Sequence, residues 1–353
     1  MSEWTIRSAT LDDRDAAIVL MDRAYGPAKN RAELWDWAFM HNPHTRDLYY
    51  LVADTGTALV AQYAAVPVAM QHHGQRIRGL LSMFTATDPA FQRRGLFRTL
   101  AQTLYDNAED TCPIVFGFPN DKSGPVLYTH LNWVALRPYP HLRRPLRNSG
   151  KHSGGSRAMA LGARGLEAAD LIGRDKTITV VPVDNFTGIT DQIWDRVKPH
   201  IGTAIIRDES FLNWRFVQSP FEYLRLVAIR NDKPVGIAVL ATDRSNGKAR
   251  LMEFMVAPGE KLGVTRTLLS RVIQLATESG AYGLGFIATP RHPQWKAMLA
   301  AGLLPAIQAH LPVSPIDERT SSFGVRVNSS AVTPSQILHI NDWYLSSADQ
   351  DWL

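Results

Sequence analysis

The chain has 353 residues, of which 45% are hydrophobic and 20% are charged, so it can bury a large core and is not a disordered protein. Its 38 lysines and arginines exceed its 33 acidic residues only slightly, too small an excess to indicate a nucleic-acid-binding protein. A single cysteine, Cys112, excludes a disulfide framework and a cysteine-rich zinc site.

The start of the chain is acidic where a secretory signal peptide needs a basic and then an apolar segment. No apolar run approaches the roughly 18 residues that a membrane span needs. We therefore expect a cytoplasmic protein that binds neither membranes nor nucleic acid.

The first part of the chain has the periodicities of a mixed α/β fold. Alternating and β-rich runs predict strands, whereas apolar residues spaced three and four apart predict helices. In chain order we expect strands at residues 4–8, 49–53, 58–68, 80–87 and 114–118, and helices at residues 12–25, 32–40, 95–108 and 126–131.

Three segments of this first part recur later in the same order. The pattern W-x-F-x-x-x-P begins at Trp37 and again at Trp214, and Leu-Val-Ala occurs at 51–53 and 226–228. The run that begins at Gly95 is then matched by the run that begins at Gly263. Three ordered matches predict two copies of one fold, and we interpret the two tryptophans as core or cleft residues.

The most informative segment for function follows the strand that ends near Thr87. A turn with Arg93, Arg94 and Gly95 leads into a helix that carries Arg98. A helix N-terminus offers unpaired amides and partial positive charge, and a glycine there lets a ligand approach the backbone. The segment thus predicts an anion site that is neither a P-loop nor a dinucleotide-binding loop.

Residues 92–97 resemble the pyrophosphate loop of the GCN5-related N-acetyltransferases (GNAT), whose pattern is Gln/Arg-x-x-Gly-x-Gly/Ala. Residues 127–133 resemble the later tyrosine segment of that family. The match departs at Phe97, where the family usually has glycine or alanine, and at Asn132, where it usually has glycine.

The resemblance implies an α/β protein with two tandem acetyltransferase-like domains, each with a central, mostly antiparallel sheet flanked by helices. We expect an acyl-CoA-binding domain at 1–142, a linker and connecting helix at 143–175, a degenerate second domain at 176–312, and a tail at 313–353 that docks on the body.

The resemblance also implies an N-acyltransferase that takes acetyl-CoA or another acyl-CoA as co-substrate. Thr85 and Thr87 would offer backbone groups to the pantetheine arm, and Tyr128 would protonate the leaving thiolate; Tyr128 could equally anchor its helix to the core. The residues that would hold the pyrophosphate are Gln92, Arg93, Arg94, Gly95, Phe97 and Arg98.

In the second copy, Glu260 lies in the turn where the phosphates of acyl-CoA would have to bind, and its negative charge would repel them. We therefore assign acyl-CoA binding to the first copy alone. Glu253 occupies a strand position where single-domain relatives often hold a base, although a solvated or ion-paired glutamate is the more common reading. The matching strand of the first copy offers Ser82 and Met83 and no carboxylate.

Two further groups have alternative readings. The turn with Asn120 and Ser123 resembles one in larger acyltransferases of bacterial surface-sugar pathways, and its side chains could bind pantetheine or the acceptor or simply cap a helix. His72 and His73 lie near a hairpin turn, and because the sequence suggests no third ligand we expect no metal site.

The leading hypothesis is an acyl-CoA-dependent N-acyltransferase, with acetyl transfer to a small amine. By analogy with the family, we expect the acceptor to be an amino sugar, such as a nucleotide-linked amino sugar. The alternative acceptor is an antibiotic or an amino-acid-derived amine. The contrasting hypothesis is a non-catalytic acyl-CoA-binding protein that regulates a partner. Amine-dependent release of thiol from acetyl-CoA separates the two classes.

Overall fold

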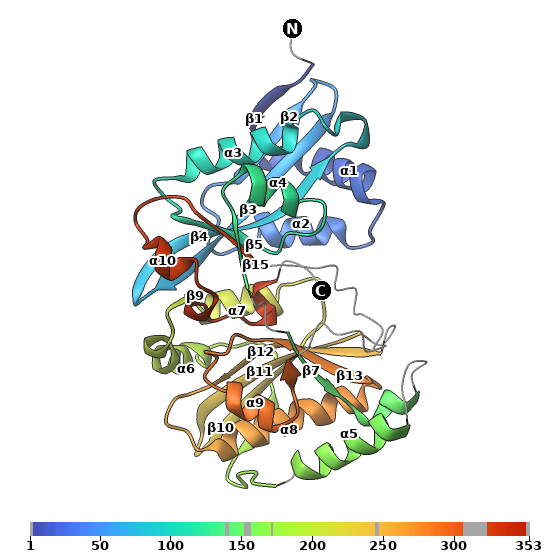
Figure 1. Ribbon diagram of the computed structural model, residues 1–353, viewed down its shortest axis with the longest axis vertical. Helices are drawn as coiled ribbons and strands as arrows, with labels where there is room; N and C mark the ends of the chain where they lie inside the picture. The colour runs from blue at the N-terminus through green and yellow to red at the C-terminus, as the bar shows by residue number, and fades with distance from the viewer. Residues whose placement is uncertain are drawn as a thin grey trace.

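The computed structural model describes residues 3–137, 141–151, 157–170, 172–243, 247–305 and 323–350. The chain forms two mixed sheets flanked by helices, one above the other along the long axis of the molecule (Figure 1). No helix in the described part of the chain combines the length and the apolar character that a membrane crossing requires.

The first sheet has the order β1-β2-β3-β4-β5-β15-β6, with β9 (Thr203–Ile205) paired to β3. All neighbours are antiparallel except β4 and β5. Its strands are β1 (Thr5–Ser8), β2 (Tyr49–Asp54), β3 (Leu59–His72), β4 (Gln75–Thr87), β5 (Ile114–Gly117), β6 (Val134–Leu136) and β15 (Phe323–Val327). Its helices are α1 (Arg14–Tyr25), α2 (Arg31–Phe39), α3 (Leu96–Ala108) and α4 (Gly124–His130).

The second sheet has the order β14-β7-β13-β12-β11-β10-β8. Its strands are β7 (His141–Pro145), β8 (Thr179–Pro182), β10 (Leu224–Arg230), β11 (Lys233–Asp243), β12 (Lys248–Val256), β13 (Gly283–Ile287) and β14 (Leu304–Pro305). The helices of this half are α5 (Arg157–Asp170), α6 (Thr190–Val197), α7 (Glu209–Phe216), α8 (Leu262–Glu278) and α9 (Trp295–Ala300), and α10 (Pro334–Ile337) follows β15.

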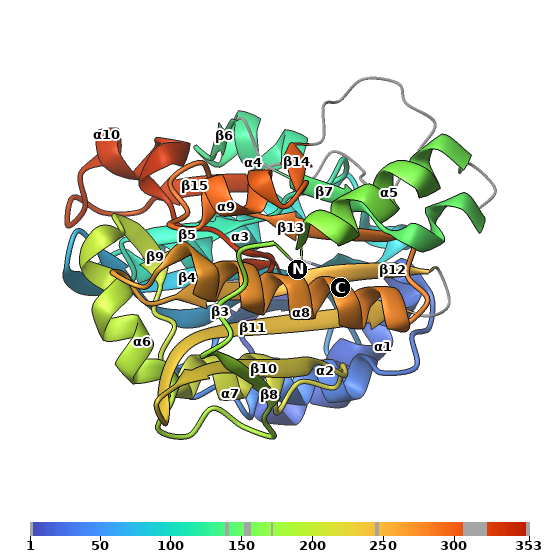
Figure 2. The ribbon, with the colours of Figure 1, turned by 90° about the horizontal axis from the view of Figure 1, so that it is seen from below.

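Three hydrophobic cores form between these layers. The central core joins the inner faces of both sheets and takes apolar residues from α1, α2, α6 and α7. On the outer faces, α3 and α4 cover the first sheet, and α8 and α9 cover the second. Figure 2 shows α8 in front of the second sheet. Successive strand residues such as Leu51 and Val52 point into different cores, which is why β2 is apolar without interruption.

The two halves exchange one strand. β7 follows the first half along the chain but lies between β13 and β14, and β15 follows the second half but lies between β5 and β6. The sequence analysis had divided residues 141–145 between the first domain and the linker, and had expected the tail only to dock. Local sequence patterns cannot show which sheet a strand joins, because the partner is chosen by long-range register.

Candidate active site

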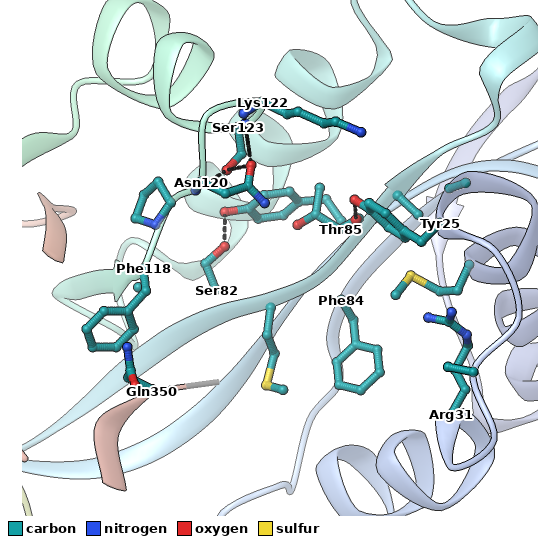
Figure 3. Close-up of a pocket in the computed structure, with 18 of the residues that line it drawn as sticks. Tyr25, Arg31, Ser82, Phe84, Thr85, Phe118, Asn120, Lys122, Ser123 and Gln350 are labelled. Carbon is teal, nitrogen blue, oxygen red and sulfur yellow. Dashed lines mark hydrogen bonds between the residues drawn. The ribbon is translucent and has the colours of Figure 1, made fainter. Parts of the chain in front are cut away.

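A cleft of about 2480 Å³ lies between the two halves. On one side it is lined by β4, the turn before α3 and the segment from Gly117 to Trp133. On the other side it is lined by parts of the second half near Val217, Asp243 and Arg250, together with Gln350 of the C-terminal segment. Figure 3 shows Ser82, Asn120, Tyr25 and Gln350 arranged around this space.

The cleft opens where β4 leaves β5. The two parallel strands pair only from Gly79 to Leu81, although β4 continues to Thr87. Past Leu81 the edge of β4 that faces β5 therefore has no strand partner there, and its backbone groups can bind an extended ligand.

A bulge in β4 marks the middle of this free edge. The register against β3 shifts near Ala64, and Phe84 has a φ of 54°, which is strained for an aromatic residue. The Nε2 of Gln62 donates to the Phe84 carbonyl over 3.0 Å, and the Phe84 ring is buried. The bulge brings Thr85 to the cleft lining, and Thr87 also lines it.

The Thr85 carbonyl already has a protein partner. The hydroxyl of Tyr25, at the end of α1, donates to it over 2.6 Å (Figure 3). Arg31 holds the following loop, since its Nε contacts Asp22 at 2.6 Å and its Nη2 donates to the Gly26 carbonyl at 2.6 Å. These residues close the cleft on the side of α1 and α2, and the sequence analysis did not identify them.

The predicted anion turn lies at the same end of β4. Arg93 and Gly95 have φ values of 65° and 81°, and α3 begins at Leu96. A Cβ at Gly95 would meet no heavy atom within 4 Å, so the backbone there is open. Gln92, Arg93 and Arg98 are exposed and line the cleft. Neither arginine bonds to another described residue, and the turn therefore fits a diphosphate.

Arg94 and Phe97 make contacts within the protein that the sequence analysis did not anticipate. Arg94 pairs with Glu3 and donates to the Ala90 carbonyl at 3.2 Å, and its guanidinium lies 4.8 Å from the centre of the Phe91 ring. Arg94 is absent from the cleft lining, since it is used to fix the N-terminal strand to the turn. The Phe97 ring packs 5.6 Å from that of Tyr63, so it covers the core as well as lining the cleft.

Asn120 organises the turn before α4. Its Oδ1 accepts hydrogen bonds from the amides of Lys122 and Ser123 at 2.9 and 3.0 Å. This is the capping alternative of the sequence analysis, and Asn120 is the residue whose side chain makes the cap. Both residues still line the cleft, and no described residue accepts from the Asn120 side-chain nitrogen. Asn120 can therefore cap the turn and donate to a ligand.

A chain of hydroxyl groups leads from the core to Ser82. The Trp133 Nε1 donates to the Tyr105 hydroxyl at 3.0 Å, that hydroxyl lies 2.6 Å from the hydroxyl of Tyr63, and the Tyr63 hydroxyl lies 2.7 Å from the Ser82 Oγ. In the other two contacts either hydroxyl can donate. Because indole is a donor only, protons directed from Tyr105 to Tyr63 and from Tyr63 to Ser82 give each buried phenol proton an acceptor. The Ser82 hydroxyl is left to donate into the cleft.

This chain was missed by the sequence analysis, which noted Ser82 only for lacking a carboxylate. Burial raises the pKa of Tyr63 to about 12 and also raises the pKa of Tyr105 well above its usual value, so both phenols stay protonated. Their spacing along β3 and α3 carries no pattern from which the contact could be predicted.

Tyr128 is half-buried on α4 and does not line the cleft. Its hydroxyl lies 3.0 Å from the position that a Cβ at Gly324 of β15 would take. The side chain therefore packs toward the exchanged strand, in agreement with its reading as an anchor, and its role as an acid stays a prediction.

Glu253 is fully buried and does not line the cleft. Its carboxylate accepts from the Arg207 Nε at 2.8 Å, the Tyr344 hydroxyl at 2.7 Å and the Ser346 hydroxyl at 2.8 Å. Burial raises the pKa of Glu253, but the Arg207 charge and these hydrogen bonds outweigh it and lower the pKa overall. The geometry is that of a buried ion-pair partner rather than a base.

In the second half, the C-terminal segment lies where β12 and β13 separate, the place that corresponds to the opening between β4 and β5 in the first half. β12 pairs with β13 only from Lys248 to Leu251, so these strands also separate. The Ile287 amide donates to the Ser347 hydroxyl at 3.1 Å, at the end of β13. Glu260, in the turn that matches the anion turn, pairs with Arg230. These contacts occupy the two places that correspond to the free edge and the anion turn of the first half, and the absence of acyl-CoA binding there stays a prediction.

Residues 5–135 match the family model of an acetyltransferase (GNAT) domain. The first part of this chain is a GNAT domain. The resemblance seen in the first part of the sequence is thereby confirmed, and this part of the chain has an acetyltransferase (GNAT) domain. No curated protein matches the sequence at a significant level.

Solved structures share the fold over most of the chain. A GCN5-related N-acetyltransferase from Kribbella flavida has a TM-score of 0.60 and 18% identity, covering 92% of this chain and 71% of that one. A probable N-acyltransferase from Enterococcus faecalis has a TM-score of 0.57 and 11% identity over 80% of this chain, which spans only 64% of that protein. Saccharomyces cerevisiae N-myristoyltransferase, solved with myristoyl-CoA, has a TM-score of 0.56 and 11% identity, covering 95% of this chain and 86% of that one.

Proposed function

We propose that this chain is an acyl-CoA-dependent N-acyltransferase whose first half binds the thioester and whose amine acceptor lies between the two halves. The observation that carries the proposal is the free edge of β4, which ends at an arginine-glycine turn and opens into the cleft. An extended arm with a diphosphate at one end fits these two features together.

The diphosphate would bind at the first amides of α3, with Arg93 and Arg98 adding charge-assisted hydrogen bonds. The pantetheine amides would pair with the backbone of β4 around Thr85 and Thr87. Because the Tyr25 hydroxyl holds the Thr85 carbonyl, acyl-CoA would have to displace this hydrogen bond or bind the neighbouring groups.

In the reaction, the amine nitrogen attacks the thioester carbon and the carbon–sulfur bond breaks. The nitrogen loses one proton and the sulfur gains one, so the products are an amide and free thiol. Ser82 would donate a hydrogen bond to the developing negative charge, held in direction by Tyr63 and Tyr105. Preorganised donors of this kind contribute to catalysis by electrostatic stabilisation.

For the acceptor we propose a polar amine, with a nucleotide-linked amino sugar as the first candidate and an antibiotic or amino-acid-derived amine as the alternative. The side of the cleft formed by the second half carries both aromatic and charged side chains, among them Phe221, Glu222, Tyr223, Arg225 and Arg250. Such a lining can stack on a ring and bind phosphate and hydroxyl groups.

The test is release of free thiol from acetyl-CoA in the presence of a panel of amines from these classes. The proposal predicts thiol release that depends on one class of amine, with the acyl group recovered on that amine. Binding of acetyl-CoA without amine-dependent turnover for any acceptor would instead support the non-catalytic acyl-CoA-binding protein.

A further inference from the structure

A cluster of possible metal ligands lies at the tip of the β3–β4 hairpin, away from the cleft. His72 ends β3, His73 is in the turn with a φ of 47°, and Asp342 ends the short helix η5 (Ile340–Asp342). One ligand atom from each side chain lies within 4.8 Å of the other two. The sequence suggested no third ligand for the histidine pair, and the fold supplies one from the C-terminal segment.

The spacing of two of these atoms, those of His73 and Asp342, is close to that of a metal site. The His73 Nε2 lies 2.9 Å from the Asp342 Oδ1. Two ligands of a tetrahedral zinc ion are about 3.3 Å apart, given Zn–N and Zn–O bonds of about 2.0–2.1 Å. An ion could therefore replace the His73–Asp342 ion pair after a shift of a few tenths of an ångström.

Thr203 of β9 orients the other two ligands. The Thr203 hydroxyl donates to the Asp342 Oδ2 at 2.6 Å. The His72 Nδ1 lies 2.9 Å from the Thr203 hydroxyl oxygen and must therefore be the donor in that contact. This places the proton of a neutral His72 ring on Nδ1 and leaves Nε2 as the nitrogen that can bind an ion.

Two neighbouring features fix the positions of these groups. A Cβ at residue 202 would lie 2.5 Å from the Asp342 Oδ1, so Gly202 leaves the space that this carboxylate occupies. The His72 ring also hydrogen-bonds to Gln336, so an ion would displace a neutral hydrogen bond there. The His73 side chain remains 44% exposed, which gives an ion access from solvent.

We propose that His72, His73 and Asp342 bind one divalent transition-metal ion, with Zn²⁺ as the ion that two imidazoles and a carboxylate suit best. The ion joins the β3–β4 hairpin of the first half to the segment that runs from β15 to Gln350. At the two ends of this segment, β15 lies between β5 and β6 in the first sheet and Gln350 lines the cleft. β4 extends for 13 residues from this tip toward the cleft, about 40 Å at ~3.3 Å per residue, so the ion has a structural role.

The test is a titration of tag-free, EDTA-treated full-length protein with ZnCl₂ by calorimetry, with zinc content measured after dialysis. We expect one ion per chain and a higher melting temperature with zinc, because the ion binds the folded state. His73→Ala and Asp342→Ala should each weaken binding by about tenfold or more, whereas His41→Ala, at an exposed histidine beyond α2, should not.

The melting temperature of each metal-free variant shows whether it is folded. If Asp342→Ala does not fold, Asp342→Asn, which keeps the size of the side chain, is used in its place. Absence of stoichiometric zinc in the wild-type chain, or equal zinc affinity in the wild type and the folded variants, would overturn the proposal. Neither result bears on acyl transfer.

Discussion

The indole rings of Trp37 and Trp214 stack face to face, with centroids 4.4 Å apart and planes within 2° of parallel. The Nε1 of each ring donates to the backbone carbonyl of the other tryptophan at 2.8 Å. The two residues hold the same position in the repeated W-x-F-x-x-x-P pattern and are buried, as the sequence predicted. The two halves therefore meet through equivalent residues of α2 and α7, related by a local two-fold axis.

We expect Trp37→Phe and Trp214→Phe each to lower the free energy of unfolding by about 1–3 kcal/mol, since each leaves a buried carbonyl without its donor. In a double-mutant cycle the two changes should couple, because they remove parts of one reciprocal contact. Denaturant unfolding of the four proteins measures both effects. Additive losses, or losses no larger than for the half-buried Trp295→Phe, would contradict the reading of this contact.

The strand exchange predicts that the first half cannot fold alone. A fragment of residues 1–137 lacks β15, which lies between β5 and β6 and is the only described strand that pairs with β6. The fragment should unfold without a cooperative transition or aggregate through its open edge. Circular dichroism during thermal unfolding tests this against the full chain, and a cooperative transition in the fragment would contradict it.

His292 makes stability depend on pH. It is buried and accepts from the Gln294 amide at 3.1 Å, and burial lowers its pKa to about 4. Since the folded pKa is below the ordinary value of about 6.5, the unfolded chain binds the proton first. The contribution of His292 is complete above about pH 6.5 and is lost as the pH falls toward 4, by about 3 kcal/mol.

Denaturant unfolding between pH 7 and pH 4 measures this contribution. His292→Phe, which keeps a ring against Tyr344, should give a shallower pH dependence than the wild type. The exposed His200→Phe serves as the control. A profile of unchanged slope in His292→Phe would show that other groups cause the dependence.

We expect substitutions at Ser82 and at Tyr128 to have different effects on kcat. If Ser82 donates to the reacting thioester, Ser82→Ala should lower kcat by about 10²-fold with little change in the KM for acetyl-CoA. Tyr128→Phe should change kcat much less, because its hydroxyl lies toward Gly324 rather than in the cleft. Tyr63→Phe breaks the chain behind Ser82 and should give an intermediate loss. A large loss in Tyr128→Phe alone would restore that tyrosine as the acid.

Much of the fold follows from local sequence. The helices predicted at 32–40 and 95–108 agree to within one residue with α2 (Arg31–Phe39) and α3 (Leu96–Ala108). They could be predicted because apolar periodicity and the prolines and glycines around a helix are local signals. The β3–β4 hairpin was underestimated, since the polar end of β3 at Gln71 and His72 is buried where it pairs with β9 from the other half. The strand exchange likewise depends on pairings between distant segments.

The candidate site follows from sequence only in part. The turn at Arg93 and Gly95 was found because a glycine before a helix has a direct physical meaning. The direction of Arg94, the enclosure of Glu253 and the exposure of the Ser82 hydroxyl depend on which residues pack around them. One sequence does not contain that information in any local pattern.

The most direct test of the account is the affinity of acetyl-CoA for the wild-type chain and for two variants, measured by calorimetry at two salt concentrations. We predict that the double variant Arg93→Ala/Arg98→Ala binds about tenfold or more weakly, with less dependence on salt, because two charge-assisted contacts to the diphosphate are lost. Arg94→Ala, whose guanidinium is bound to Glu3, should bind acetyl-CoA as the wild type does. Equal affinity in the wild type and the double variant would contradict the assignment of this turn to the thioester carrier.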